Sequence, residues 1–137
     1  MSAISGSLED REQIRELYAR YAITIDNSRY DQWIDCFTED GVFESPRFGR
    51  YAGRDGLSKF VVTYRESLGG AQVRHVISTV SFQVDGERAT GSCYLTYFHS
   101  KNGKTELAAV GHYRDVLSKA GGEWRFKSRQ VFIDGHG

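Results

Sequence analysis

The chain has little cysteine, little proline and no net charge. Its 137 residues include 2 Cys and 1 Pro, and 18 Lys and Arg balance 18 Asp and Glu. Cys36 and Cys93 lie far apart and lack CxxC or Cys/His spacing, which excludes a disulfide framework. We expect both to be buried free thiols. The charge balance creates no overall field that favours nucleic acid, so no nucleic-acid partner is predicted.

Long apolar runs are also missing. The uncharged apolar stretches are a few residues long, which is too short for a membrane span. The N-terminus has neither the basic segment nor the apolar core of a signal peptide, so we predict a cytoplasmic location and no membrane partner. With 39% hydrophobic and 13% aromatic residues, the chain can bury the core of one domain, residues 1–137. Residues 1–6 and 135–137 are expected to be flexible.

Helical patterns come first along the chain. Residues 7–26 begin with the capping pattern of Ser7 and Asp10 and then repeat apolar side chains at helical spacing. Two further helices are predicted, a short one over residues 30–37 and a longer one from about residue 53 to 68. The last turn of the first predicted helix carries an acidic residue on the apolar side of the helix.

Alternating patterns follow the helices. Thr38–Gly41 is typical of a turn, and the segment after it is extended. Hairpin signals such as Asn102-Gly103 separate four long predicted strands. These strands are residues 73–84, 88–99, 104–118 and 123–134. The order favours an α+β fold with the helices on one face of a strongly curved antiparallel sheet.

Two histidines share the inward parity of neighbouring strands. His75 alternates with Val73 and Ile77, and His99 lies on the inward parity of the next predicted strand. The two could line one cavity, or they could be hydrogen-bonded structural imidazoles. His136 lies in the C-terminal tail and is interpreted as part of a mobile end.

A carboxylate lies at the end of the first helix. Asp26 continues the spacing of Tyr18 and Ala22, in the last turn, where the helix dipole disfavours a negative charge. It therefore needs a partner or a role, unless it forms an Asx turn before Asn27. Beside a histidine, such a carboxylate would fix the imidazole tautomer and stabilise the imidazolium of a general base.

Other side chains could complete a site. Arg129 could receive a leaving anion or an enolate oxygen, or it could belong to a solvated strand face with Arg125 and Lys127. Aromatic side chains could line a cavity for a ring-shaped substrate or form plain core. These are Tyr18, Tyr21, Trp33, Tyr97 and Tyr113. No motif for a nucleophile, a nucleotide or a metal competes, so neither a cofactor nor a metal is predicted.

Four segments carry a resemblance to a known family. They are IRELYARYAITIDNSRYDQWIDCFTEDGVFES, YAGRDGLSKFV, VRHVIS and GHYRDVLSKAGGEWRFKSRQV. Together they resemble the SnoaL-like branch of the nuclear-transport-factor-2-like superfamily over residues 8–134. The resemblance implies a cone-shaped barrel, in which N-terminal helices close a pocket inside a bent mixed sheet. Within the family the pattern is most similar to scytalone dehydratase and hexachlorocyclohexane dehydrochlorinase, two cofactor-free lyases.

The resemblance also implies roles for individual residues. Asp26 and His75 correspond to the catalytic pair of both enzymes, with His75 as the general base. His99 corresponds to a second active-site histidine of the dehydratase, and Arg129 to an active-site arginine of the dehydrochlorinase. Tyr21 stands where the dehydrochlorinase has a lysine, so the general acid does not carry over.

We therefore predict a cofactor-independent lyase or isomerase, of dehydratase or β-elimination type, acting on a small cyclic or aromatic substrate. One alternative is a noncatalytic binding or assembly subunit, such as the small subunit of a ring-hydroxylating dioxygenase. Another is an enzyme resembling polyketide cyclases or ketosteroid isomerase, with Asp26 as the base. The predicted strand at residues 104–117 is apolar on both faces, which favours a homo-oligomer, a dimer or a trimer.

Overall fold

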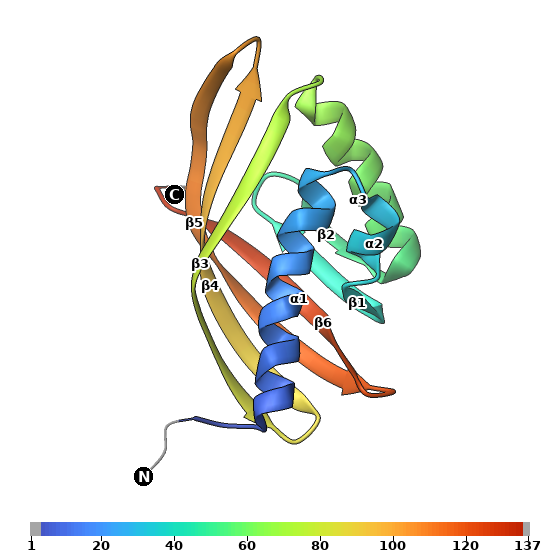
Figure 1. Cartoon of the computed structure of the whole chain (residues 1–137). Helices are drawn as coiled ribbons and strands as arrows, with labels where there is room; N and C mark the ends of the chain where they lie inside the picture. Colours follow the sequence, from blue (N-terminus) through green and yellow to red (C-terminus); the bar gives the residue numbers. More distant parts are fainter. Residues whose placement is uncertain (1–3, 136–137) are drawn as a thin grey trace.

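The computed structural model describes residues 4–135, which form three helices and one six-stranded sheet (Figure 1). The helices are α1 (Leu8–Asp26), α2 (Tyr30–Ile34) and α3 (Gly53–Leu68). The strands are β1 (Phe37–Ser45), β2 (Gly49–Ala52), β3 (Gln72–Asp85), β4 (Arg88–Lys101), β5 (Lys104–Ala120) and β6 (Glu123–Ile133). His136 lies outside the described residues. Near the start, Ser5 is held in place, because its hydroxyl oxygen accepts a hydrogen bond from the backbone N–H of Val84 over 2.7 Å.

Helix α1 begins and ends where the pattern predicts. The Ser7 hydroxyl caps it by accepting a hydrogen bond from the backbone N–H of Asp10 at 3.0 Å. At the other end, the side chain of Asn27 donates to the carbonyl of Ile23 over 2.8 Å. Asn27 thus closes the helix with its own side chain, and Asp26 is left available to interact with the sheet.

The sheet has the strand order β2-β1-β6-β5-β4-β3. All neighbours are antiparallel except β1 and β6, which run parallel. The predicted meander of four long strands is confirmed. Its Asn102-Gly103 turn has both residues in the left-handed region, with φ of 53° and 73°, as a two-residue hairpin of this kind requires.

Predictions for the segment after α2 are wrong in two respects. The helix predicted over 30–37 ends at Ile34, and residues 38–41 belong to β1 instead of forming a turn between elements. Phe37 and Val42 both pair with β6, and the register shifts between them. The turn-like residues are therefore an irregular stretch inside a strand that is paired at both ends.

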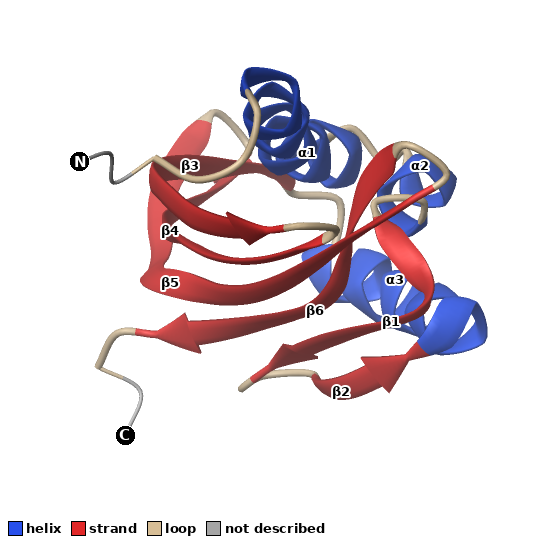
Figure 2. Cartoon of the chain, turned by 90° about the horizontal axis from the view of Figure 1, so that it is seen from below, coloured by secondary structure: helices blue, strands red, loops and turns tan. Residues whose placement is uncertain are grey.

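The sheet curves around the helices without closing (Figure 2). Among residues 4–135, the edge strands β2 and β3 do not pair with each other, so the expected barrel has an open seam. Helix α1 packs against β3 and β6, and α3 packs against β1 and β2. The helices thus cover the concave face of the sheet, where inward-pointing side chains of β3 to β6 meet them.

Aromatic side chains form much of the core between helices and sheet. Trp33 is fully buried, and its ring lies 5.0 Å from that of Phe37 and 5.4 Å from that of Phe60, between centroids. Cys36 and Cys93 are buried free thiols, as predicted. Burial raises the pKa of both thiols to about 11, which keeps them protonated at neutral pH.

Candidate active site

The end of α1 and the first half of β3 bring Asp26 and His75 together. Nδ1 of His75 lies 2.5 Å from Oδ1 of Asp26, and the backbone N–H of His75 donates to Oδ2 over 2.9 Å. The side chains are 9% (His75) and 8% (Asp26) exposed. When the imidazole is neutral and donates Nδ1–H to the carboxylate, the other ring nitrogen, Nε2, has a free lone pair. This arrangement suits a general base.

A cavity of about 420 Å³ lies beside this pair, between the concave face of the sheet and α3. His75 forms part of its wall, and so does His99 on the neighbouring strand β4. Seven further lining residues are aromatic and come from α1, α3, three strands and the turn between β1 and β2. They are Tyr21, Phe43, Phe48, Phe60, Tyr64, Tyr97 and Tyr113. A largely aromatic wall with a few polar groups is typical of a site for a small organic molecule.

Three of the predicted residues form a row along the cavity wall. The ring centroids of His75 and Tyr97 are 4.5 Å apart, and those of Tyr97 and His99 are 4.9 Å apart. Nε2 of His99 is buried and has no hydrogen-bond partner within residues 4–135. Buried polar atoms normally have partners, so an unpaired nitrogen beside a cavity is unusual.

Sequence reasoning missed a tyrosine pair in the same wall. The hydroxyls of Tyr64 on α3 and Tyr97 lie 2.6 Å apart. Burial, with the neighbouring Tyr97 as a further cause, raises the pKa of Tyr64, and burial also raises that of Tyr97. Both hydroxyls therefore remain protonated and can donate. Tyr64 shares the helical spacing of the core residues Leu57 and Phe60, and nothing in the sequence distinguishes its hydroxyl.

The structure does not place Arg129 in the cavity wall. Its side chain has no exposed area, and it donates from Nε to Oδ1 of Asp115 over 2.8 Å. Its guanidinium carbon lies 4.3 Å from the ring centre of Tyr21 and 3.7 Å from that of Tyr113. Two rings that line the cavity therefore stand in contact with Arg129. Neither the solvated strand face nor direct contact with a substrate describes this position.

Two predicted aromatic residues also lie behind the wall. Trp33 and Tyr18 are not among the residues that line the cavity, and each is at most 1% exposed. The Tyr18 hydroxyl donates to Oδ2 of Asp115 over 2.6 Å. Tyr18 thus belongs with Arg129 in one buried network, whereas Tyr21, Tyr97 and Tyr113 reach the cavity.

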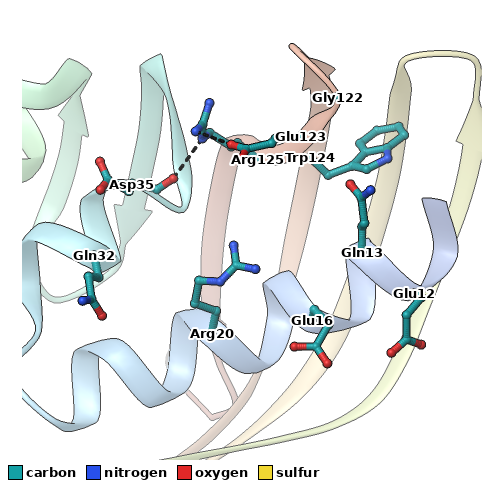
Figure 3. A pocket seen from close by; sticks show the side chains of 10 residues that line it. All are labelled: Glu12, Gln13, Glu16, Arg20, Gln32, Asp35, Gly122, Glu123, Trp124 and Arg125. Atoms are coloured by element: carbon teal, nitrogen blue, oxygen red, sulfur yellow. Dashed lines mark hydrogen bonds and ion pairs between the residues drawn. The ribbon is translucent and has the colours of Figure 1, made fainter. Parts of the chain in front are cut away.

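A second hollow, of about 650 Å³, runs between α1 and the start of β6 (Figure 3). Its lining is mostly polar and includes Gln13, Arg20, Trp124 and Arg125. Arg125 already donates to the carbonyl oxygen of Asp35 over 3.1 Å. The residues that line this hollow include no His or Cys, so it offers no counterpart of the Asp26–His75 pair.

The described part of the chain contains neither a metal-binding cluster nor a membrane-spanning helix. Within residues 4–135, no group of three or more His, Cys, Asp or Glu side chains is placed to hold a metal ion. Over the same residues, no helix has both the length and the apolar composition needed to cross a membrane.

Comparison with known families identifies the fold. The chain matches the SnoaL-like domain over residues 6–130. It belongs to the SnoaL-like family. Among curated proteins, this SnoaL-like chain is 28% identical to the anthranilate 1,2-dioxygenase small subunit of Burkholderia cepacia, over 149 residues that cover 98% of the chain and 92% of that subunit. The resemblance seen in the sequence is therefore confirmed at the level of the family.

Solved structures support the same fold. A nuclear-transport-factor-2-like protein with a cystatin-like fold from Novosphingobium aromaticivorans has a TM-score of 0.86 at 26% identity, covering 95% of this chain and 85% of that one. A protein of unknown function from Mycobacterium tuberculosis, solved as a variant, has a TM-score of 0.84 at 28% identity, covering 94% and 76%. These similarities establish the architecture.

Proposed function

We propose that this SnoaL-like protein is a cofactor-independent lyase or isomerase that acts in the cytoplasm on a small cyclic or aromatic molecule. Its reaction type would be dehydration or β-elimination, as in scytalone dehydratase and hexachlorocyclohexane dehydrochlorinase. The supporting observation is the pairing of Asp26 with His75 at the wall of an aromatic cavity.

His75 is the general base in this proposal. Its Nε2 lone pair takes a proton from a carbon next to an electron-withdrawing or leaving group. The C–H electron pair then forms a carbon–carbon double bond as the leaving group departs, or it is reprotonated at a second carbon. Asp26 stabilises the imidazolium because its carboxylate already contacts Nδ1.

Donors on the same wall would receive the charge that develops. Tyr97 carries a protonated hydroxyl, and His99 has an unpartnered ring nitrogen. Either can hydrogen-bond an enolate oxygen or donate a proton to a departing hydroxide. Tyr113 lines the cavity as well. Arg129 would act on this charge only through its contact with the rings of Tyr21 and Tyr113.

The alternative in which Asp26 is itself the base is less well supported. Both of its oxygens already accept hydrogen bonds from His75, one from the ring and one from the backbone. Asp26 is also absent from the residues that line the cavity. A carboxylate that abstracts a proton would have to reach the substrate, which Asp26 does not do from behind the imidazole.

The proposal is tested by exchange of substrate hydrogens in D₂O, followed by NMR over a panel of cyclic ketones and β-hydroxy ketones. We expect His75→Gln to lower turnover by about a hundred- to ten-thousand-fold. His112→Gln is the matched control, because His112 stacks on Phe132 at 4.9 Å between ring centroids and does not line the cavity. Full activity in His75→Gln would rule out the mechanism.

The role of Asp26 can be read without a substrate. ¹⁵N NMR of the histidine ring distinguishes the Nδ1–H from the Nε2–H tautomer, and we expect His75 to be the Nδ1–H form when neutral. Asp26→Asn should change the tautomer ratio of His75 and leave that of His112 unaltered. An identical His75 signal in both proteins would mean that Asp26 does not orient the ring.

A second candidate function is a noncatalytic assembly subunit, which the similarity to a dioxygenase small subunit favours. Tyr94 and Leu107 are each 58% exposed, and apolar side chains of this kind suit a homo-oligomer, a dimer or a trimer. Light scattering of the wild type and of Leu107→Glu tests this assembly. A stable oligomer with no exchange activity over the whole panel would favour this second function.

A further inference from the structure

The turn between β1 and β2 places a cation at the cavity. Arg47 lies in this turn, is exposed to solvent, and forms part of the cavity lining together with Phe48. Its guanidinium carbon lies 5.0 Å from the centre of the Phe48 ring. Phe48 in turn packs edge-on against Phe60 at 5.5 Å between centroids. A ring anchored in the core therefore supports the cation at the rim of the cavity.

The charge of Arg47 is not balanced by its surroundings. Among the described residues that line the cavity, Arg47 is the one Lys or Arg, and none is Asp or Glu. Within residues 4–135, Arg47 takes part in no salt bridge. Asp26 lies behind His75, and both of its carboxylate oxygens contact His75 instead of Arg47. The rim thus attracts an anion, while the depth of the cavity suits neutral rings.

We propose that the substrate of this cavity carries a carboxylate, which Arg47 binds at the rim while the ring system of the substrate lies against the aromatic walls. A guanidinium presents paired N–H donors that match the two oxygens of a carboxylate. The reacting carbon would then lie deeper, beside His75, away from the bound carboxylate. The inference rests on the proposed function for the reaction itself, but the binding step can be measured separately.

The experiment compares two probes of nearly equal shape, 2-naphthoate and 2-naphthamide, by isothermal titration calorimetry. We expect the wild-type chain to bind the acid about tenfold more tightly than the amide, as for a hydrogen bond to a charged group. Arg47→Gln should remove this preference by lowering the affinity for the acid while leaving the affinity for the amide unchanged. Arg47→Lys should keep part of the preference. Added salt should weaken binding of the acid more than binding of the amide.

Arg50→Gln is the matched control, because Arg50 is exposed on β2 and does not line the cavity. It should retain the full preference for the acid. The proposal is overturned if wild type binds acid and amide equally or if neither probe binds at millimolar concentration. It is also overturned if Arg47→Gln and Arg50→Gln lose the preference for the acid to the same extent. Thermal unfolding of each variant verifies that the fold is intact.

The same set of proteins separates this proposal from the proposed reaction. His75→Gln should lose turnover yet keep the preference for the acid, since the base is not the anion site. If the wild-type chain shows no preference for the acid while His75→Gln loses turnover as expected, the carboxylate site alone is overturned. If the wild-type chain prefers the acid while His75→Gln keeps full turnover, the proposed reaction alone is overturned.

Discussion

Two buried carboxylates between α1 and the sheet each pair with a nitrogen-bearing side chain, and the surroundings of the two pairs differ. In the closed pair, Asp115 and Arg129, neither side chain has any exposed area, and Tyr18 donates a further hydrogen bond to the carboxylate. In the open pair, Asp26 and His75, the side chains are 8% and 9% exposed, and the imidazole forms part of a cavity wall. The imidazole of the open pair can therefore meet a molecule in the aromatic cavity, whereas the side chains of the closed pair have no exposed area with which to do so.

The comparison shows why burial of a charge does not by itself mark a catalytic group. Burial lowers the pKa of the Arg129 guanidinium, but the charge of Asp115 and other neighbours raises it well above its usual value. Arg129 therefore keeps its proton at every physiological pH. Histidine is the residue type that exchanges a proton near neutral pH. Cavity access together with a proton that can move is what distinguishes the open pair.

The largest predicted effect on the free energy of unfolding comes from breaking the closed pair. Asp115→Ala leaves the Arg129 charge buried without a counter-ion, and we expect the free energy of unfolding to fall by about 3–5 kcal/mol. Asp26→Ala should cost less, about 1–3 kcal/mol, because His75 can remain neutral and adjoins the cavity. Urea denaturation of both variants at neutral pH measures the difference. Equal losses would contradict the distinction between the two pairs.

A double variant sharpens this result. Replacing both partners, Asp115→Leu with Arg129→Met, removes the uncompensated charge together with its counter-ion. Apolar replacement of a buried ion pair is often neutral or stabilising. We therefore expect the double variant to recover most of the stability that Asp115→Ala loses. No recovery would mean that the hydrogen bond from Tyr18 or the aromatic contacts of Arg129 carry the stabilisation.

Regular spacing made the open pair predictable. Helical periodicity placed Asp26 on the inner side of α1, and strand alternation placed His75 between the inward residues Val73 and Ile77. Alternation alone did not predict whether an inward side chain reaches a cavity or is buried in the core. Alternation put Arg129 on one face of β6, but whether that face meets a cavity or a packed core depends on sheet curvature. Arg47 lies in a turn, where no period exists to indicate its direction.

The fold shows the same limit. The four long strands and their hairpin turns were predicted because each turn joins neighbouring strands with a local signal. The pairing of β1 with β6 was not, since it joins segments far apart in sequence and depends on Phe37 and Val42 finding partners across the molecule. Residues 38–41 have turn composition, and tertiary pairing overrides that local preference.

A smaller effect is expected at the neutral tyrosine pair in the cavity wall. Tyr64→Phe removes the hydroxyl that lies 2.6 Å from that of Tyr97, and we expect a loss of about 0.5–1.5 kcal/mol in the free energy of unfolding. Turnover should fall less than in His75→Gln. Tyr51→Phe is the control, because within residues 4–135 the Tyr51 hydroxyl makes no hydrogen bond and the ring packs on Phe60. Urea denaturation that fails to separate the two variants would exclude a stabilising role for the hydroxyl pair.

The smallest effect concerns a third carboxylate, which lies at the opposite end of α1 and nearer to solvent. Oδ1 of Asp10 accepts hydrogen bonds from Nε1 of Trp124 and Nζ of Lys119, both at 2.9 Å. The bond from Trp124, followed by that from Lys119, lowers the pKa of Asp10 below its usual value of 3.8. Its folded-state pKa is depressed, so the stabilisation is present above pH 3.8 and is lost as the pH falls through the folded value.

Asp10→Asn should therefore unfold at a lower urea concentration than wild type at pH 7, and the gap should close as the pH falls below 3.8 and through the folded-state pKa of Asp10. Added salt should narrow the gap at pH 7, because the Lys119 side chain is 30% exposed and its charge is screened. The closed pair, Asp115 and Arg129, should respond far less to salt, since buried charges are screened little. A gap that does not narrow at all as the pH falls below 3.8 would mean that Asp10 acts through packing and not through its charge.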